Sequence, residues 1–283
     1  QLMVVTAGGD LLLEDMVIRS GLSPGNGGAI SVLGGTLEMV RCVITGNAAD
    51  DGGAVYAAQG AFIARESTFA DNLARDGGAV YAHDTRVELS DCVFRKNRAT
   101  NQGGALLASG GSTVDVEECD YEGNAAEVLG GAVFVRAQST LAARAVTFRG
   151  NKAATPGDTL ARGGAAYLSE STASFADAGF FDNEADEGGA VASFLGAVAT
   201  TRATFRRNTA HLGGALSVKQ GTLTDVGSLV TDNAADMKGG GLYLSSRANL
   251  NASTTTKIEH NVPDDVSTTV TSSAVGAAGA AAP

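Results

Sequence analysis

The sequence predicts an all-β fold: a right-handed single-stranded parallel β-helix, a solenoid of about ten turns with three short strands in each turn. The prediction rests on two motifs that alternate along the 283 residues and share one period. Periods of this length are typical of solenoids, in which each unit buries its apolar face only against its neighbours. Function is therefore expected in the surfaces and in departures from the repeat.

The first motif is a pair of glycines followed by a small residue. Most copies lie 25 to 27 residues apart. Glycine pairs suit a bend with positive φ at a place where adjacent turns crowd. The first glycines of the nine pairs are Gly27, Gly52, Gly77, Gly103, Gly130, Gly163, Gly188, Gly213 and Gly239.

The second motif places an apolar residue, often phenylalanine, three positions before an asparagine. Asparagine tolerates the left-handed conformation at a strand end, and its side-chain amide can donate to one neighbouring turn and accept from the other. We therefore expect a structural ladder along the solenoid. Its members are Asn47, Asn72, Asn97, Asn124, Asn151, Asn183, Asn208, Asn233 and Asn261.

Three short segments in each period alternate apolar and polar residues, as residues 28–32, 37–39 and 42–44 do. This alternation predicts half-buried strands. Each turn buries only about six side chains, at roughly 1.5 to 3 kcal/mol each. Ordering its residues costs roughly 1.5 kcal/mol per residue. The turns therefore need to stack in register, and the usual hand of crossover connections predicts a right-handed coil.

The repeats extend over residues 1–262, which we expect to form one β-helix domain. Residues 263–283 are rich in Ala, Ser, Thr and Gly, and this composition is typical of a tail or linker. Asn251, in Asn251-Ala252-Ser253, is the candidate site of N-glycosylation.

Composition excludes several function classes. The net charge of -11 argues against nucleic acid as a partner, because phosphate binding needs clustered Lys and Arg. No apolar run approaches the roughly 18 to 20 residues of a membrane span, so we expect no direct membrane span in this chain.

The three cysteines, Cys42, Cys92 and Cys119, occupy one column of the repeat that also holds Ser, Val and Ala. Such a column is typical of a core, so buried thiols are expected. Cys92 and Cys119 lie one turn apart, close enough for a disulfide by Cα separation. The sequence leaves open whether they are bridged.

Candidate catalytic residues are not found, and no cofactor is expected. Asp50, Asp51 and Asp76 lie close together in adjacent turns and form a weak candidate calcium site, with solvated carboxylates as the alternative. The three histidines occupy different phases of the repeat in distant turns, so we expect neither a metal site nor a nucleophile–base pair among them.

One column of aromatic residues is the candidate binding surface. Strand alternation predicts that it faces away from the core, where stacked rings can bind sugars or a protein partner. Its members are Tyr56, Tyr81, Phe134, Tyr167 and Tyr243, and Ala192 and Ser217 interrupt it. The insertion Lys152 to Arg162 is a second candidate, because long loops in solenoids often carry specificity.

The motifs Gly-Gly-Ala-Val, at residues 52–55 and 77–80, and Phe-x-x-Asn, at residues 69–72 and 94–97, resemble the repeats of the chlamydial polymorphic outer-membrane protein family. This resemblance covers roughly residues 18 to 262 and implies a non-enzymatic structural or adhesive segment of a larger extracellular or cell-surface protein. Its partners would be other protein chains of a surface assembly or glycans. The alternative is a carbohydrate-active β-helix enzyme, a polysaccharide lyase or hydrolase.

Overall fold

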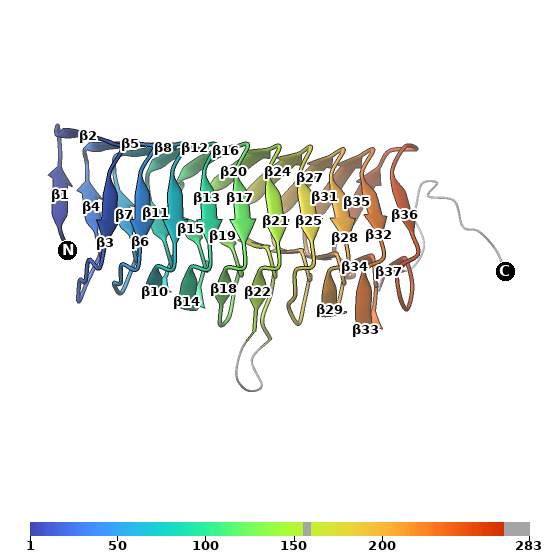
Figure 1. Ribbon diagram of the computed structural model, residues 1–283. Helices are drawn as coiled ribbons and strands as arrows, with labels where there is room; N and C mark the ends of the chain where they lie inside the picture. Colours follow the sequence, from blue (N-terminus) through green and yellow to red (C-terminus); the bar gives the residue numbers. More distant parts are fainter. Residues whose placement is uncertain (155–159, 269–283) are drawn as a thin grey trace.

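A computed structural model describes residues 1–154 and 160–268. These residues form a parallel β-solenoid without a helix, and the predicted fold class is confirmed. Successive turns stack side by side into a rod with β1 at one end and β36 at the other (Figure 1). Each turn contributes one strand to each of three long parallel sheets, here called sheets A, B and C.

Sheet A begins each three-strand turn, sheet B follows it, and sheet C completes the turn. Sheet A consists of β1 (Met3–Thr6), β4 (Ile30–Leu33), β7 (Val55–Ala58), β11 (Val80–His83), β15 (Leu106–Ser109), β19 (Val133–Arg136), β23 (Ala166–Ser169), β26 (Val191–Phe194), β30 (Leu216–Lys219), β34 (Leu242–Leu244) and β37 (Val266–Thr268). Sheet B consists of β2 (Asp10–Glu14), β5 (Thr36–Val40), β8 (Ala61–Arg65), β12 (Arg86–Ser90), β16 (Thr113–Glu117), β20 (Thr140–Arg144), β24 (Thr172–Ala176), β27 (Ala197–Thr201), β31 (Thr222–Val226) and β35 (Asn249–Ala252). Sheet C consists of β3 (Val17–Arg19), β6 (Val43–Thr45), β9 (Thr68–Ala70), β13 (Val93–Arg95), β17 (Asp120–Glu122), β21 (Thr147–Arg149), β25 (Gly179–Phe181), β28 (Thr204–Arg206), β32 (Leu229–Thr231) and β36 (Lys257–Glu259).

Some turns carry a fourth short strand directly after the ladder asparagine, which the three-strand prediction does not include. These strands form two small parallel sheets. They are β10 (Leu73–Asp76), β14 (Arg98–Gln102), β18 (Ala125–Ala126) and β22 (Lys152–Ala153) in one, and β29 (Thr209–Leu212) and β33 (Ala234–Lys238) in the other.

The glycine pairs sit where each turn bends into sheet A. Gly77 has a φ of +62°, in the left-handed region that glycine adopts without strain. Glycine is required at residue 78 for a different reason, because a Cβ atom there would lie 2.0 Å from the carbonyl oxygen of Gly104 in the next turn. The pair therefore combines a conformational requirement at its first position with a steric one at its second.

The nine asparagines form a continuous hydrogen-bonded column inside the rod, each at most 7% exposed. The Nδ2 group of each of the first eight donates to the Oδ1 atom of the next asparagine at 2.9 to 3.0 Å. The same Oδ1 atom accepts the main-chain N–H of the preceding asparagine at 2.9 to 3.1 Å. The left-handed residue is the one before the asparagine, for example Asp71 or Lys96, rather than the asparagine itself.

The column ends on a carboxylate. Asn261 donates from its main-chain N–H and from Nδ2 to Oδ1 of Asp265, at 3.0 and 2.9 Å. Asp264 accepts the N–H groups of Gly239 and Gly240 in the same region. The sheet also extends beyond residue 262, because β37 pairs with β34. The first residues of the predicted tail thus cover the last turn, and residues 269–283 lie outside the described residues.

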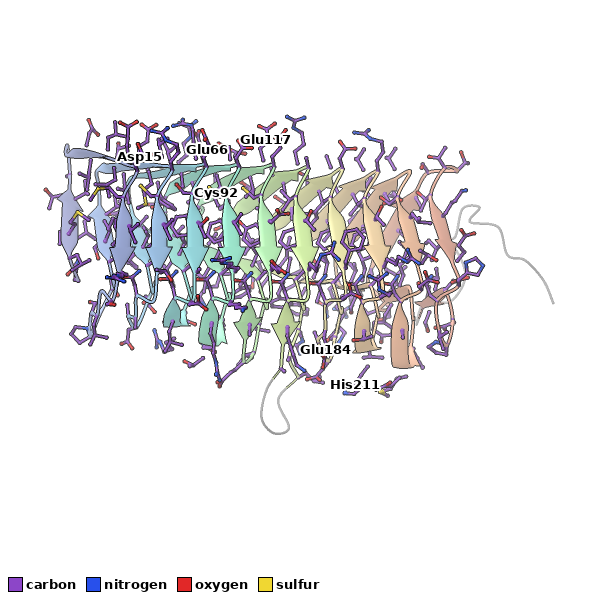
Figure 2. The ribbon with its side chains drawn as sticks, in the orientation of Figure 1. Asp15, Glu66, Cys92, Glu117, Glu184 and His211 are labelled. Carbon is purple, nitrogen blue, oxygen red and sulfur yellow. The ribbon has the colours of Figure 1, made fainter. Side chains whose placement is uncertain are left out.

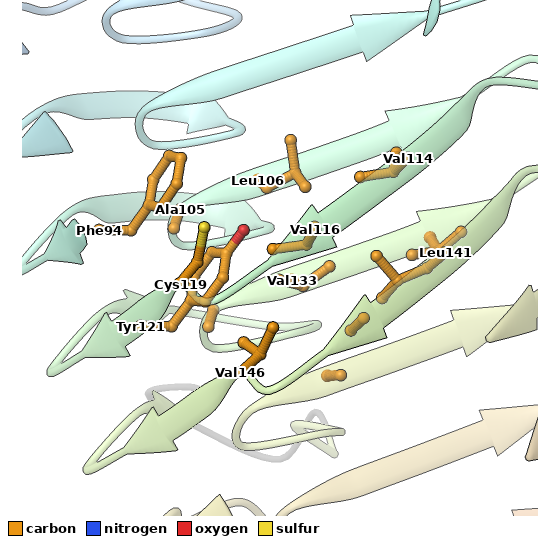
Figure 3. Packing of buried hydrophobic residues seen from close by; sticks show 14 of the residues in the cluster. Phe94, Ala105, Leu106, Val114, Val116, Cys119, Tyr121, Val133, Leu141 and Val146 are labelled. Carbon is orange, nitrogen blue, oxygen red and sulfur yellow. The ribbon is translucent and has the colours of Figure 1, made fainter. Parts of the chain in front are cut away.

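Inside the coil, large side chains of like type stack along the axis. Rings of the column that precedes the asparagines are parallel and 4.5 to 5.0 Å apart from Phe69 to Phe205. Figure 3 shows Phe94 and Tyr121 beside Cys119 and Val116 in this core. The three cysteines are buried and free, so the structure contains no bridge between Cys92 and Cys119. Instead, the main-chain N–H of Cys92 donates to Sγ of Cys119 at 3.2 Å.

Substitution of a ladder asparagine tests this description. Asn124→Ala removes two donors and an acceptor from a fully buried column. The main-chain N–H and Nδ2 groups of Asn97 lose a shared acceptor, and the carbonyl of Phe94 and Oδ1 of Asn151 each lose one donor. We expect the free energy of unfolding to fall by at least about 3 kcal/mol. The matched control is Asn249→Ala on the exposed edge of β35, with an expected change within about 0.5 kcal/mol. Equal urea midpoints for the two variants would contradict the structural role of the ladder.

Substitution of Tyr121 is expected to raise the stability of the protein rather than lower it. Tyr121 stands among phenylalanines in the ring stack, and its hydroxyl is buried without a hydrogen-bond partner among the described residues. Tyr121→Phe should therefore raise the free energy of unfolding by about 1 kcal/mol, because it removes an unsatisfied polar group. The reciprocal control Phe148→Tyr should lower it. A destabilised Tyr121→Phe protein in thermal melts would show that the hydroxyl has a partner.

Candidate functional site

The predicted aromatic column lies on the outer side of sheet A, away from the main core. Its rings form two separate stacks, Tyr56 with Tyr81 and Phe134 with Tyr167, each with ring centroids 5.4 Å apart. Tyr243 is half-buried at the C-terminal end of the column, with the ammonium group of Lys219 6.0 Å from its ring centroid. The structure thus brings the five residues onto one face but not into one continuous ridge.

The expectation that the whole column is exposed is wrong. Phe134 and Tyr167 are only 3% and 4% exposed, and they form a small second hydrophobic cluster with Leu107 and Ala192. Tyr56 and Tyr81 are half-buried and present part of their rings to solvent. The accessible rings of the column are therefore the N-terminal pair and, at the other end, Tyr243.

Long side chains on either side of the column explain this burial. Leu129, in the position before a glycine pair, packs against the cluster, and the guanidinium of Arg136 lies 5.7 Å from the Phe134 ring centroid. The hydroxyl of Tyr167 accepts a hydrogen bond from Arg162, but burial has the larger effect and raises the pKa of Tyr167. Strand alternation gave the direction of these rings but not what covers them.

The candidate calcium ligands are held by a cation of the protein itself. Arg75 Nη2 lies 3.0 Å from Oδ1 of Asp51 and 3.3 Å from Oδ2 of Asp76. Asp76 is 6% exposed and also accepts a hydrogen bond from Asn101 at 2.8 Å. Asp50 is exposed. The guanidinium group therefore occupies the place between two carboxylates where a calcium ion would lie.

Metal-ligating residues do not gather elsewhere in the described part of the chain: no group of three or more His, Cys, Asp or Glu side chains is close enough to hold a metal ion there. His83 lies 3.1 Å from Ser109 Oγ. His211 stands between two carboxylates, with Nδ1 2.8 Å from Asp236 and Nε2 3.5 Å from Asp186. His83 and His211 thus have different partners in different turns.

Ion pairs between neighbouring turns cover the edges of the rod. Figure 2 places Asp15, Glu66 and Glu117 along one edge, and Glu184 and His211 along the opposite edge. Asp15 accepts two hydrogen bonds from Arg41 one turn later, and this contact holds the pKa of Asp15 below its ordinary value. Asp15 and Glu184 thus each pair with a cation of a neighbouring turn.

A shallow groove on the outer face of sheet B is lined by several carboxylates. It has a volume of about 450 Å³ and runs over β8, β12, β16, β20 and β24. Glu88, Asp115 and Glu117 line it together with Arg65 and Arg144. Arg144 pairs with Glu117, and Glu88 pairs with Arg86 outside the groove.

The remaining candidates are placed as follows. Asn251 is exposed on β35, where a glycan could be attached without disturbing the core. Of the insertion Lys152 to Arg162, residues 155–159 lie outside the described residues, while Arg162 pairs with Glu187 at 3.2 Å. The search for membrane-spanning helices finds none in the described chain.

Comparison with known families agrees with this geometry. Residues 3–153, just over half of the chain, match the family described as right handed beta helix region. The chain therefore belongs to the right-handed β-helix family, and the predicted hand of the coil is confirmed. Searches of curated proteins and of solved structures found no match.

The buried carboxylate of Asp76 gives a pH-dependent prediction. Burial raises its pKa above the ordinary value of 3.8, against the opposing effects of Arg75 and Asn101. The folded protein then holds the proton more tightly than the unfolded chain, so this group lowers stability as pH rises from about 4 through its folded pKa. Asp76→Asn should remove that loss, whereas Asp50→Asn, at an exposed position, should not. If the urea midpoints of wild type and Asp76→Asn differed by the same amount at every pH between 4 and 7, this prediction would be contradicted.

Proposed function

We propose that this chain is a non-enzymatic structural or adhesive β-helix segment of a larger extracellular or cell-surface protein. It acts as a rigid rod that presents its faces to other protein chains of a surface assembly or to glycans. The likeness of its paired motifs to the repeats of chlamydial polymorphic outer-membrane proteins supports this location and role.

The observation that carries the proposal is the pairing of exposed charges between successive turns. Arg202 makes a bidentate contact with Asp177, and Arg207 makes one with Asp182, with N–O distances of 2.6 to 2.9 Å. Each exposed pair contributes little to stability by itself. Repeated along the rod, such pairs limit the freedom of the surface side chains and favour a stiff edge. These are useful properties for a spacer.

The half-exposed rings of Tyr56 and Tyr81 are the proposed contact point. They stack on adjacent strands of sheet A, and Asp51 lies near Tyr56. Stacked tyrosines combine apolar area with a hydroxyl at the rim, a combination that suits both sugar rings and protein partners. Their side chains also lose little conformational freedom on binding.

The sheet B groove favours the second candidate, a carbohydrate-active enzyme. Glu88, Asp115 and Glu117 line one open groove, and acid–base cleavage of polysaccharides uses paired carboxylates. In this chain Glu88 pairs with Arg86 and Glu117 pairs with Arg144, so only Asp115 of the three has no arginine partner among these contacts. Cleavage needs two carboxyl groups that act together on the substrate, so we rank this candidate second.

Adhesion measurements test the first candidate. Beads coated with the protein are applied to cell surfaces and to immobilised glycans, and the double variant Tyr56→Ser/Tyr81→Ser is compared with wild type. We expect binding to fall at least about tenfold, because exposed aromatic residues dominate such contacts. The control is Thr140→Ser/Thr172→Ser on sheet B, which should bind as wild type.

Two results would contradict the proposal. One is equal adhesion of the double tyrosine variant and wild type with unchanged circular dichroism. The other is release of oligosaccharides from acidic polysaccharides by the purified protein, with loss of that activity in Asp115→Asn. The second result would favour the enzyme.

A further inference from the structure

The interruption of the aromatic column creates a hollow on sheet A. Tyr167, Ala192, Ser217 and Tyr243 are register partners in four successive strands. The two middle strands thus carry the small side chains of Ala192 and Ser217 at the position where the first and last strands carry a tyrosine ring. A hollow of about 270 Å³ lies at the first of these two positions, against Ala192. Tyr167, Ala192 and Phe194 form its apolar wall and floor.

A buried carboxylate lies at the edge of this hollow. Glu187 is 2% exposed, and Ser217 Oγ donates to its Oε1 atom at 2.6 Å. Its Oε2 atom accepts from Lys219 Nζ at 2.9 Å and from Arg162 Nε at 3.2 Å. Three protein donors therefore satisfy both oxygens of Glu187. The carboxylate of Glu187 therefore holds Arg162 and Lys219 in position, and its own oxygens are already hydrogen-bonded to the protein.

The cations retain unused donors. Arg162 has four further N–H groups besides Nε–H, one of them directed to Tyr167, and Lys219 has two further ammonium protons. The two side chains are 36% and 28% exposed, so they reach the solvent side of the hollow. Arg162 and Lys219 carry two positive charges and Glu187 one negative charge, so the edge of the hollow has a net positive charge. A ligand that fits this edge is a hydrogen-bond acceptor with a negative charge.

We propose that this hollow binds the carboxylate of a small acid with a ring-sized apolar body. The carboxylate accepts from Arg162 and Lys219, and the ring packs on Tyr167 and Phe194 in the place of the missing rings of the column. The volume lies just below the roughly 300 to 1,000 Å³ of sites for drug-sized ligands, so the ligand is fragment-sized. This inference does not depend on the proposed adhesive function.

The same chemistry has two sources, a free acid and an acidic side chain next to an aromatic one in a partner peptide. The experiment therefore uses three probes in calorimetric titrations of the whole chain. They are benzoate, its neutral isostere benzamide, and the acetylated and amidated tetrapeptide Ala-Asp-Phe-Ala. Stronger binding of benzoate identifies a free acid, and stronger binding of the tetrapeptide identifies a peptide partner; both support a carboxylate site.

Two substitutions with matched controls locate the binding. Lys219→Met should weaken benzoate binding at least about tenfold, whereas Lys96→Met, the same change at an exposed position, should leave it unchanged. Ala192→Phe should fill the hollow and abolish binding, and its ring should continue the stack on Tyr167 without loss of fold. Ala142→Phe adds the same ring on the outer face of sheet B, and benzoate binding should be unaffected.

Three outcomes overturn the proposal. They are equal binding of benzamide and benzoate by wild type, full benzoate binding by folded Ala192→Phe, and no detectable binding of either benzoate or the tetrapeptide. The first comparison uses only the wild-type protein, so the test does not depend on the folding of any variant.

Discussion

Hydrogen bonding between equivalent residues of successive turns is the constraint on which the rest of this structure depends. A single turn cannot bury enough apolar surface to offset the entropy lost when it becomes ordered. Stability therefore comes from the contact between turns, and that contact requires register. The backbone supplies hydrogen bonds along sheets A, B and C, but these alone do not distinguish one register from a shifted one. The asparagine column distinguishes them, because each side-chain amide must hydrogen-bond the amide of the next turn, at 2.9 to 3.0 Å, inside the core.

Register in turn explains the other features of the rod. Rings stack on rings in the core because like positions lie above one another, and the bidentate pairs of Arg41 with Asp15 and of Arg202 with Asp177 connect like positions one turn apart. The end of the column needs an acceptor, and Asp265 provides it. Departures from the repeat have consequences for the same reason. Where Ser217 replaces a ring, the carboxylate of Glu187 covers the position; where Ala192 does, a hollow remains, and the cations held by Glu187 border it.

The sequence alone predicted the features that follow from period and alternation: the three sheets, the inward residues, and the side of sheet A on which Tyr56 and Tyr167 lie. It could not predict burial that depends on the length and direction of side chains from neighbouring positions. Leu129 and Arg136 cover Phe134, so that ring is not exposed. Arg75 reaches two carboxylates that the sequence groups as candidate metal ligands. The sequence did not indicate that Glu187 is buried and hydrogen-bonded, since its partners Ser217 and Lys219 come from the following turn.

The most direct test of this account is a pair of double-mutant cycles on the ladder. Asn97 and Asn124 are hydrogen-bonded neighbours, whereas Asn97 and Asn208 are buried in the same column several turns apart. Each pair is replaced singly and together with alanine, and free energies of unfolding are measured in urea. The account predicts a coupling energy of about 1 kcal/mol or more for the neighbours and one within about 0.5 kcal/mol of zero for the distant pair. Equal coupling energies for the two pairs would show that the asparagines act as separate core residues, and would contradict a ladder that sets the register.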